Sequence, residues 1–159
     1  MKITPDQALE SVQSIFNSLD WEIELKTDPP AILTGFQIDK AHNAIVTIAF
    51  DDERQSIILG CSYCFEAPTN QRGKIRRFLF DQSQVLYGTS THYTPSKGVN
   101  VNTRCWLPDI PLGPDELRAI IEPSLKSVLK TATCLFPALI RFLREQDRLS
   151  PQGGFYLPS

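Results

Sequence analysis

The sequence predicts an α+β fold in which a single antiparallel sheet is covered on one face by helices. Three observations indicate this class. Extended or alternating segments dominate residues 21–67 and recur at residues 84–107, whereas apolar residues at helical spacing occupy both ends of the chain. A proline-rich corner at residues 108–114 joins the last extended segment to a long closing segment. Because each terminal helix has one apolar stripe, both helices are expected on the same face of the sheet.

Length and composition fit one α+β domain at residues 1–147, followed by a flexible C-terminal tail at residues 148–159. Of the 159 residues, 42% are hydrophobic and 21% are charged, which is ordinary for a globular protein. The net charge of -2 argues against nucleic-acid binding, which needs a clustered basic face. We see no signal peptide and no apolar run long enough for a membrane helix. We therefore expect a cytoplasmic protein whose four cysteines are reduced.

The first helix is predicted at residues 4–19. Thr4 and Gln7 fit a Thr-x-x-Gln capping box, and Pro5 suits the first helical position because that position needs no N–H donor. The apolar residues that fall along one face of this helix are Leu9, Val12, Phe16 and Leu19.

Four strands are predicted next. Residues 21–25 alternate strictly between apolar and acidic residues, which predicts a half-buried strand with its acids outward. A strand at residues 32–38 is followed by a hairpin connection at residues 40–43. Residues 44–50 and 56–65 are richer in apolar residues. We therefore predict that these two are the inner strands, apolar enough to be covered on both faces.

A short helix is predicted at residues 72–82, with Ile75, Phe78 and Leu79 facing the sheet. Residues 84–93 and 98–107 then form a hairpin across residues 94–97.

The closing helix is predicted at residues 115–146. Pro123 and Pro137 lack the backbone N–H of a helical residue, so we expect this helix to be kinked or interrupted. Four residues spaced four apart, Arg118, Glu122, Lys126 and Lys130, would form ion pairs along one face. The predicted buried stripe is Leu117, Ile121, Leu125, Val128, Ala132, Phe136 and Leu139. The complete order is α-β-β-β-β-α-β-β-α.

Two short motifs and this order carry a family resemblance. The alternating strand at residues 21–25 follows the first helix, and residues 106–108 lead into residues 114–117. In these features the chain resembles the YbjN-like and type III secretion chaperone-like superfamily, and its cyanobacterial members in particular, over residues 5–143. It departs from the pattern in a longer turn at residues 94–98 and in a proline within the closing helix. The resemblance implies no catalytic residues; it implies a small, often dimeric, protein-binding or regulatory scaffold.

The spacing of Cys61 and Cys64 is that of a redox pair or of half a zinc site. A redox pair normally lies at a helix N-terminus, whereas this one lies in a predicted strand, where residues three apart point to opposite faces. A zinc site needs further ligands, and Cys105 and Cys134 are isolated in apolar surroundings. We therefore favour four buried structural thiols, with a redox role or metal binding as lesser alternatives.

The histidines and the acidic run have simple structural interpretations. His42 lies in a predicted turn and His92 near a strand end, and no serine nucleophile elbow accompanies either. The acids at residues 51–53 lack the patterned loop of a calcium site and are interpreted as a charged turn. The sequence therefore predicts no catalytic residue, no cofactor and no metal site.

A basic cluster lies on the predicted short helix. Its members are Arg72, Lys74, Arg76 and Arg77, which could contact phosphate groups. RNA binding would also need stacking aromatic residues on an exposed surface, and the neighbouring Phe78 and Phe80 are expected in the core. We interpret the cluster as the solvated face of the helix.

The tail offers one candidate partner contact. Residues 150–154 are typical of a flexible tether, yet Phe155, Tyr156 and Leu157 behind them are apolar. A frayed terminus is the simpler interpretation. The alternative is that these three residues dock on a sheet edge or on a partner subunit.

These observations favour a non-enzymatic protein-binding module of chaperone-like or regulatory type that forms a two-fold homodimer and binds a further protein. A structural subunit of a larger assembly is the alternative, and an enzyme of unrecognised type is a lesser one. Neither nucleic acid nor a membrane is expected as a partner.

Overall fold

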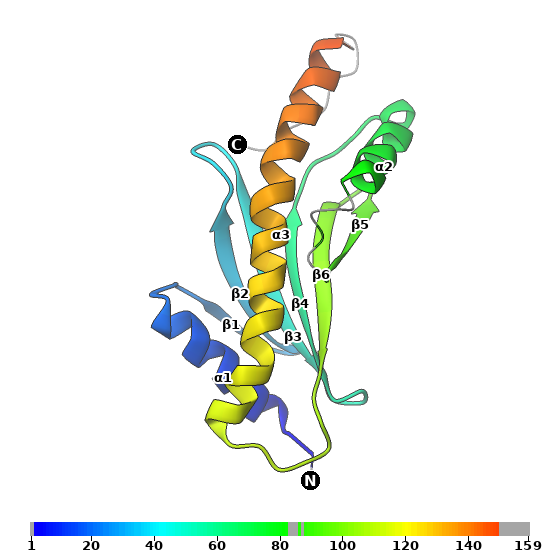
Figure 1. The fold of residues 1–159 in the computed structure, drawn as a ribbon. Helices are drawn as coiled ribbons and strands as arrows, with labels where there is room; N and C mark the ends of the chain where they lie inside the picture. The colour runs from blue at the N-terminus through cyan, green and yellow to red at the C-terminus, as the bar shows by residue number, and fades with distance from the viewer. Residues whose placement is uncertain (1, 83–85, 87, 150–159) are drawn as a thin grey trace.

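Over residues 2–82, 86 and 88–149, which the computed structural model describes, the chain forms one antiparallel sheet with three α-helices. The elements follow the predicted order α-β-β-β-β-α-β-β-α, so the α+β class is confirmed (Figure 1). The helices of this part are α1 (Pro5–Ser18), α2 (Arg72–Asp81) and α3 (Pro114–Leu149). Its strands are β1 (Glu24–Thr27), β2 (Pro30–Gln37), β3 (Asn43–Asp51), β4 (Ser56–Tyr63), β5 (Ser90–Thr94) and β6 (Gly98–Trp106).

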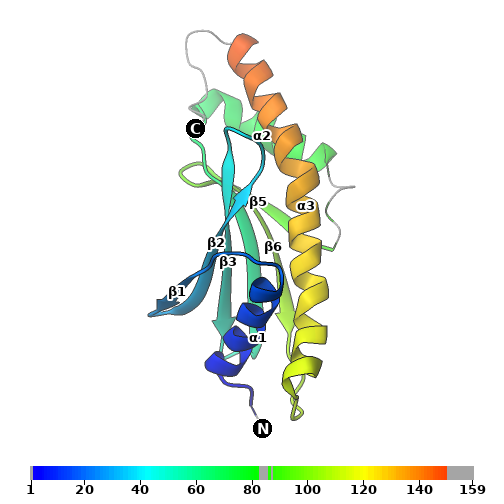
Figure 2. The same ribbon diagram turned by 90° about the vertical axis from the view of Figure 1, so that its left-hand side faces the viewer.

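The strands lie side by side in the order β1-β2-β3-β4-β6-β5, and every neighbouring pair is antiparallel. β3 and β4 are therefore the inner strands, as predicted. α1 packs on β2 and β3, α3 packs on β4 and β6, and the two helices contact each other (Figure 2). Both helices cover the same face of the sheet, which confirms the expected arrangement and places the core between that face and the helices.

α1 begins with the predicted capping box. The hydroxyl of Thr4 accepts the Gln7 N–H at 3.2 Å, and the Gln7 side chain accepts the Thr4 N–H at 3.0 Å. The predicted stripe is right at Val12 and Phe16, which are buried, but wrong at Leu19, which is 49% exposed. The chain turns after the last helical residue, and the N–H of Leu19 bonds back to Phe16. Leu19 therefore no longer follows the helical stripe. The buried residues of α1 are Ala8, Ser11, Val12, Ile15 and Phe16.

The first strand is later and more exposed than predicted. β1 begins at Glu24 rather than at Trp21, and all of its residues are exposed. Trp21 is held against the end of α1, because its N–H donates to the Phe16 carbonyl and its ring stacks on that of Phe16 at 5.5 Å between centroids. β1 is an edge strand paired only with β2, so a half-buried strand was the wrong expectation here.

α3 is one helix of 36 residues that continues through Pro123 and Pro137, so of the two predicted alternatives, a kink or an interruption, the interruption is wrong. Each proline removes one backbone hydrogen bond. Buried side chains flank both prolines and pack against the sheet, and this packing holds the helix together where the hydrogen bonds are lost. All seven residues of the predicted stripe are buried: Leu117, Ile121, Leu125, Val128, Ala132, Phe136 and Leu139.

α2 confirms the predicted short helix, but it packs on α3 and β5 at one end of the sheet (Figure 1). Ile75 and Leu79 are buried, and Phe78 stacks on Phe142 of α3 with 4.6 Å between the ring centroids. Phe80, expected in the core, is 77% exposed. It follows Leu79 by one residue, a rotation of about 100° around the helix that turns its side chain to solvent.

β5 and β6 form the predicted hairpin, in which Thr94 pairs with Gly98. β5 begins at Ser90, and the first part of the predicted strand includes residues 84, 85 and 87, which lie outside the described residues. Gly98 has φ +89, and a Cβ atom there would lie 2.1 Å from the carbonyl oxygen of Tyr63. The hairpin therefore requires glycine at this position.

We expect Gly98→Ala to lower the free energy of unfolding by more than about 3 kcal/mol, because it adds a collision to the strain of a positive φ. Gly88→Ala is the matched control. Gly88 also has a positive φ, +78, but a Cβ atom there meets nothing within 4 Å. It should therefore cost only about 1–2 kcal/mol. Urea unfolding of both variants measures the difference, and equal losses would contradict the close approach at Gly98.

Candidate functional site

The face of the sheet opposite α1 and α3 is the main candidate surface. Alternate residues of the strands point away from the helices, and their pairing sets them in rows across the sheet. Ile45 of β3 is 49% exposed, Ile58 of β4 is 36% exposed and Trp106 of β6 is 62% exposed, and all three lie on this face. We call it the open face. Its remaining residues on the four central strands are Ala31, Leu33, Gly35, Gln37, Asn43, Thr47, Ala49, Asp51, Ser56, Gly60, Ser62, Asn100, Asn102 and Arg104.

Arg104 and Trp106 form one corner of the open face. Arg104 Nη1 donates to Asp51 Oδ2 at 2.8 Å and to the Ser56 hydroxyl at 2.6 Å. Its guanidinium carbon lies over the Trp106 ring, 5.4 Å from the centroid. The hydrogen bond from Arg104, followed by that from the Arg54 N–H, holds the pKa of the Asp51 carboxyl below its ordinary value. The exposed indole of Trp106 therefore rests on an arginine that two hydrogen bonds fix in place.

A ladder of neutral polar groups crosses the next part of the open face. Asn100 donates to the hydroxyl of Ser62 at 2.6 Å, and Asn102 donates to the side-chain oxygen of Asn100 at 2.8 Å. Ser90 of β5 donates to Asn102 at 3.0 Å. These side chains bond to one another, so this part of the face is polar but largely satisfied within the chain.

A hollow lies at the corner of the open face diagonally opposite Trp106. Its floor is Gly35, where a Cβ atom would meet nothing within 4 Å. Leu33 and Ile45 form apolar walls, and the exposed acidic residues Glu22 and Glu24 stand at the rim. The hollow has a volume of about 400 Å³ and is open to solvent.

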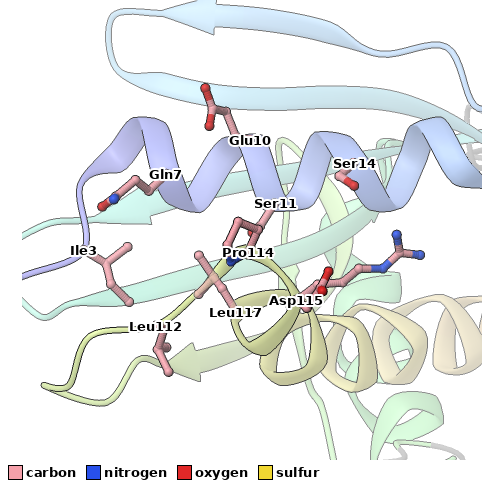
Figure 3. Close-up of a pocket in the computed structure, with 10 residues that line it drawn as sticks. Ile3, Gln7, Glu10, Ser11, Ser14, Leu112, Pro114, Asp115 and Leu117 are labelled. Carbon is pink, nitrogen blue, oxygen red and sulfur yellow. The ribbon is translucent and has the colours of Figure 1, made fainter.

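A second concave site lies between α1 and the start of α3, and its volume is about 370 Å³ (Figure 3). Its apolar lining comes from Ile3, Leu112, Pro114 and Leu117, and its polar lining from Gln7, Glu10, Ser11, Ser14, Asp115 and Arg118. Arg118 already donates to Glu122 at 3.2 Å and to the Ser18 hydroxyl at 2.9 Å. Figure 3 shows the carboxylate of Glu10 on the side of α1 away from Asp115. In a ligand site the polar groups converge on one point, whereas the polar groups of this site do not.

The prediction that all four cysteines are buried is wrong for two of them. Cys61 and Cys105 are buried, whereas Cys64 and Cys134 are exposed. Cys61 lies in β4, and Cys64 follows the end of that strand. Cys134 lies on the solvent side of α3, outside the buried stripe. Burial raises the pKa of the Cys61 thiol to about 12 and also raises the pKa of Cys105, so both are protonated at neutral pH.

The two histidines lie three places apart in the strand order. His42 precedes β3 and is buried, with its Nδ1 2.8 Å from Asp39 Oδ1, whereas His92 is exposed on β5. The Ala41 N–H and then the His42 side chain hold the pKa of the Asp39 carboxyl below its ordinary value. The ring of Tyr63 meets His42 edge-on at 6.0 Å, and burial raises the pKa of Tyr63 to about 12. This buried group was not anticipated from the sequence.

The acidic and basic clusters are partly exposed and partly paired. Asp51 of the acidic run bonds to Arg104 and Arg54. Within the described residues, His, Cys, Asp and Glu do not gather into a group of three or more that could hold a metal ion. On α2, Arg76 stacks over Tyr93 at 5.6 Å, and Arg77 lies 3.8 Å from Asp81.

The tail contact predicted at Phe155, Tyr156 and Leu157 lies outside the described residues. None of the described helices combines the length and the apolar character that crossing a membrane requires. No family model, no curated protein and no solved structure matches the chain. The candidate site therefore rests on the geometry of the chain itself, and the open face is its largest feature.

The thiol environments predict a simple labelling pattern. A thiol-reactive dye should label Cys64 and Cys134 rapidly in the native protein and should reach Cys61 and Cys105 only after denaturation. Mass spectrometry of the labelled peptides identifies the sites. The double variant Cys64→Ser, Cys134→Ser is the control, since it should show no fast labelling. Fast native labelling of Cys61 would contradict its burial.

The Arg104–Asp51 bond predicts a pH dependence. Because the pKa of Asp51 is lowered in the folded protein, its stabilisation is present above the ordinary carboxyl pKa, about 4, and is lost as pH falls through the lowered value. The decrease in Tm caused by Arg104→Met should therefore be largest at pH 7 and shrink below pH about 4. Arg54→Met should have a smaller effect, because the Arg54 side chain is 65% exposed. Thermal unfolding followed by circular dichroism at several pH values measures both decreases in Tm. If the decrease caused by Arg104→Met did not change with pH, the ion pair would be excluded as its cause.

Proposed function

We propose that the chain is a non-enzymatic, cytoplasmic protein-binding module of chaperone-like or regulatory type, and that it pairs as a two-fold dimer through its open face. The observation that carries this proposal is the composition of that face. Ile45, Ile58 and Trp106 are exposed on it together, although neighbouring side chains of the same sheet face the core. Large apolar side chains grouped on one surface are typical of protein contacts.

The distribution of charge supports the same function. On the outward positions of β2, β3, β4 and β6, the ionised side chains are Asp51 and Arg104, and these two bond to each other. The edge strand β1 carries Glu24 and Lys26, which also pair, at 2.5 Å. Protein interfaces have a core depleted in charged residues and a polar rim, and the open face has this arrangement.

The size of the face also fits a stable pair. Four of the strands have eight or nine residues, and two shorter strands flank them. Neighbouring strands lie about 4.8 Å apart, and each residue adds about 3.3 Å along a strand. The face is therefore roughly 25 Å in each direction, or roughly 600 Å² in projection. A standard interface buries about 800 Å² of accessible surface on each partner, and side-chain relief raises accessible area above the projected area.

The positions of the reactive groups support a non-enzymatic role. His42 faces the interior and is held by Asp39, His92 is three strand positions away, and burial keeps Cys61 protonated. An active site would bring such groups together around one reacting atom. The resemblance to the YbjN-like and secretion chaperone-like superfamily also supports a binding scaffold, because its expected element order is the one observed.

The test is the mass of the protein in solution. Light scattering at micromolar concentration should give about twice the 17.9 kDa of one chain. Ile45→Asp places an unpaired carboxylate beside the hollow, so it should raise the dimer Kd by more than about 100-fold while the chain stays folded. Leu149→Asp is the matched control, because Leu149 is 63% exposed at the end of α3, a helix that covers the opposite face of the sheet. A wild-type protein that stays monomeric would reject the proposal.

A further inference from the structure

Two unlike features stand at opposite corners of the open face. Trp106 projects from β6, and the hollow above Gly35 indents β2. The strand pairing places Gly35 level with Ile45, Ser62 and Asn100, and Trp106 lies six residues farther along β6. Three strand spacings and six residues then separate the two features, which is roughly 25 Å along the diagonal.

This placement has a consequence for symmetry. The midpoint of the diagonal falls between β3 and β4, near Thr47, Ile58 and Gly60, which is the middle of the open face. A two-fold axis that lies in the plane between two such faces and crosses the diagonal at right angles at its midpoint brings Trp106 of each copy over Gly35 of the other. The faces then overlap centrally, and each contact occurs twice, as in any isologous interface.

We propose that the open face is its own partner, and that each copy of the chain inserts Trp106 into the Gly35 hollow of a second copy. This inference rests on the proposed dimer and names a contact that occurs twice in it. A projecting ring and a hollow on one face are complementary to each other, so a single surface can supply both halves of the contact. The presence of both, at positions that a central two-fold axis exchanges, points to a second copy of this chain as the occupant.

The chemistry of the two features matches. The apolar walls of the hollow, Leu33 and Ile45, suit the indole ring, and the absent side chain at Gly35 leaves room for it. A buried indole N–H needs an acceptor, and the carboxylates of Glu22 and Glu24 at the rim provide one. Arg104 holds the ring in place before association, so little side-chain freedom is lost on binding.

Two single variants test the contact from both sides. Trp106→Ala removes the ring and should raise the dimer Kd by at least about 100-fold, because two identical contacts are lost. Gly35→Leu fills the hollow and should raise Kd by at least about tenfold. It should not destabilise the monomer, because a Cβ atom at this position meets nothing within 4 Å and the hollow has room for the rest of the side chain. Gly73→Leu on α2 is the matched control, since Gly73 is also exposed and unobstructed.

Combining the variants distinguishes the loss of this specific contact from a general disturbance of the open face. In the double variant Gly35→Leu, Trp106→Ala, the added leucine faces the space left by the tryptophan. The double variant should therefore dimerise at least about tenfold more tightly than Gly35→Leu alone. An equimolar mixture of the two single variants should likewise form a mixed dimer, which keeps one native contact and has one leucine–alanine contact.

Sedimentation at several protein concentrations gives the Kd of each form, and circular dichroism confirms that each is folded. If the wild type is monomeric, the proposed function and this inference both fail. If the wild type is a dimer that Ile45→Asp dissociates, while Trp106→Ala and Gly35→Leu leave Kd unchanged, the proposed function stands and this contact is wrong. The proposed contact would also be wrong if the double variant, or the mixture of single variants, had a dimer Kd no lower than that of the single variants.

Discussion

The structure depends on the packing of α3 across one face of the sheet. Its buried stripe runs from Leu117 to Leu143 and contacts β4 and β6, while α1 extends the cover to β2 and β3. Side chains of a strand alternate between faces, so a sheet covered on one face presents its other face to solvent unless another chain covers it. The open face is therefore a direct consequence of where the helices pack, and its composition decides what the protein can bind.

The covered face and the helices were largely predictable from local pattern. The capping box of Thr4 and Gln7, the stripe of α3 and the order of the elements all depend on residues close together in the sequence. The predictions were wrong where the structure of a segment depends on how a neighbouring element packs against it. β1 is exposed because α1 packs on β2 and β3 and stops short of the edge, and α3 is continuous because packing holds it at its prolines.

The candidate site was harder to predict, for a topological reason. Trp106 and Gly35 share a face only because β6 pairs with β4, which is its neighbour in the sheet but not in the sequence. No local pattern fixes that pairing. One signal was present in the sequence. Arg104 and Trp106 are two residues apart and alternate with Cys105, which is buried, so they had to point away from the core together.

The polar ladder explains how such a face could be buried at all. Burying an amide or hydroxyl without a hydrogen-bond partner costs about 1–3 kcal/mol, so polar residues normally oppose association. Here Asn100, Asn102 and Ser62 bond to one another within the chain, and Arg104 is neutralised by Asp51. Much of the hydrogen-bonding capacity of this region is therefore used before any partner arrives. On a face that solvent alone covers, water would satisfy the same groups.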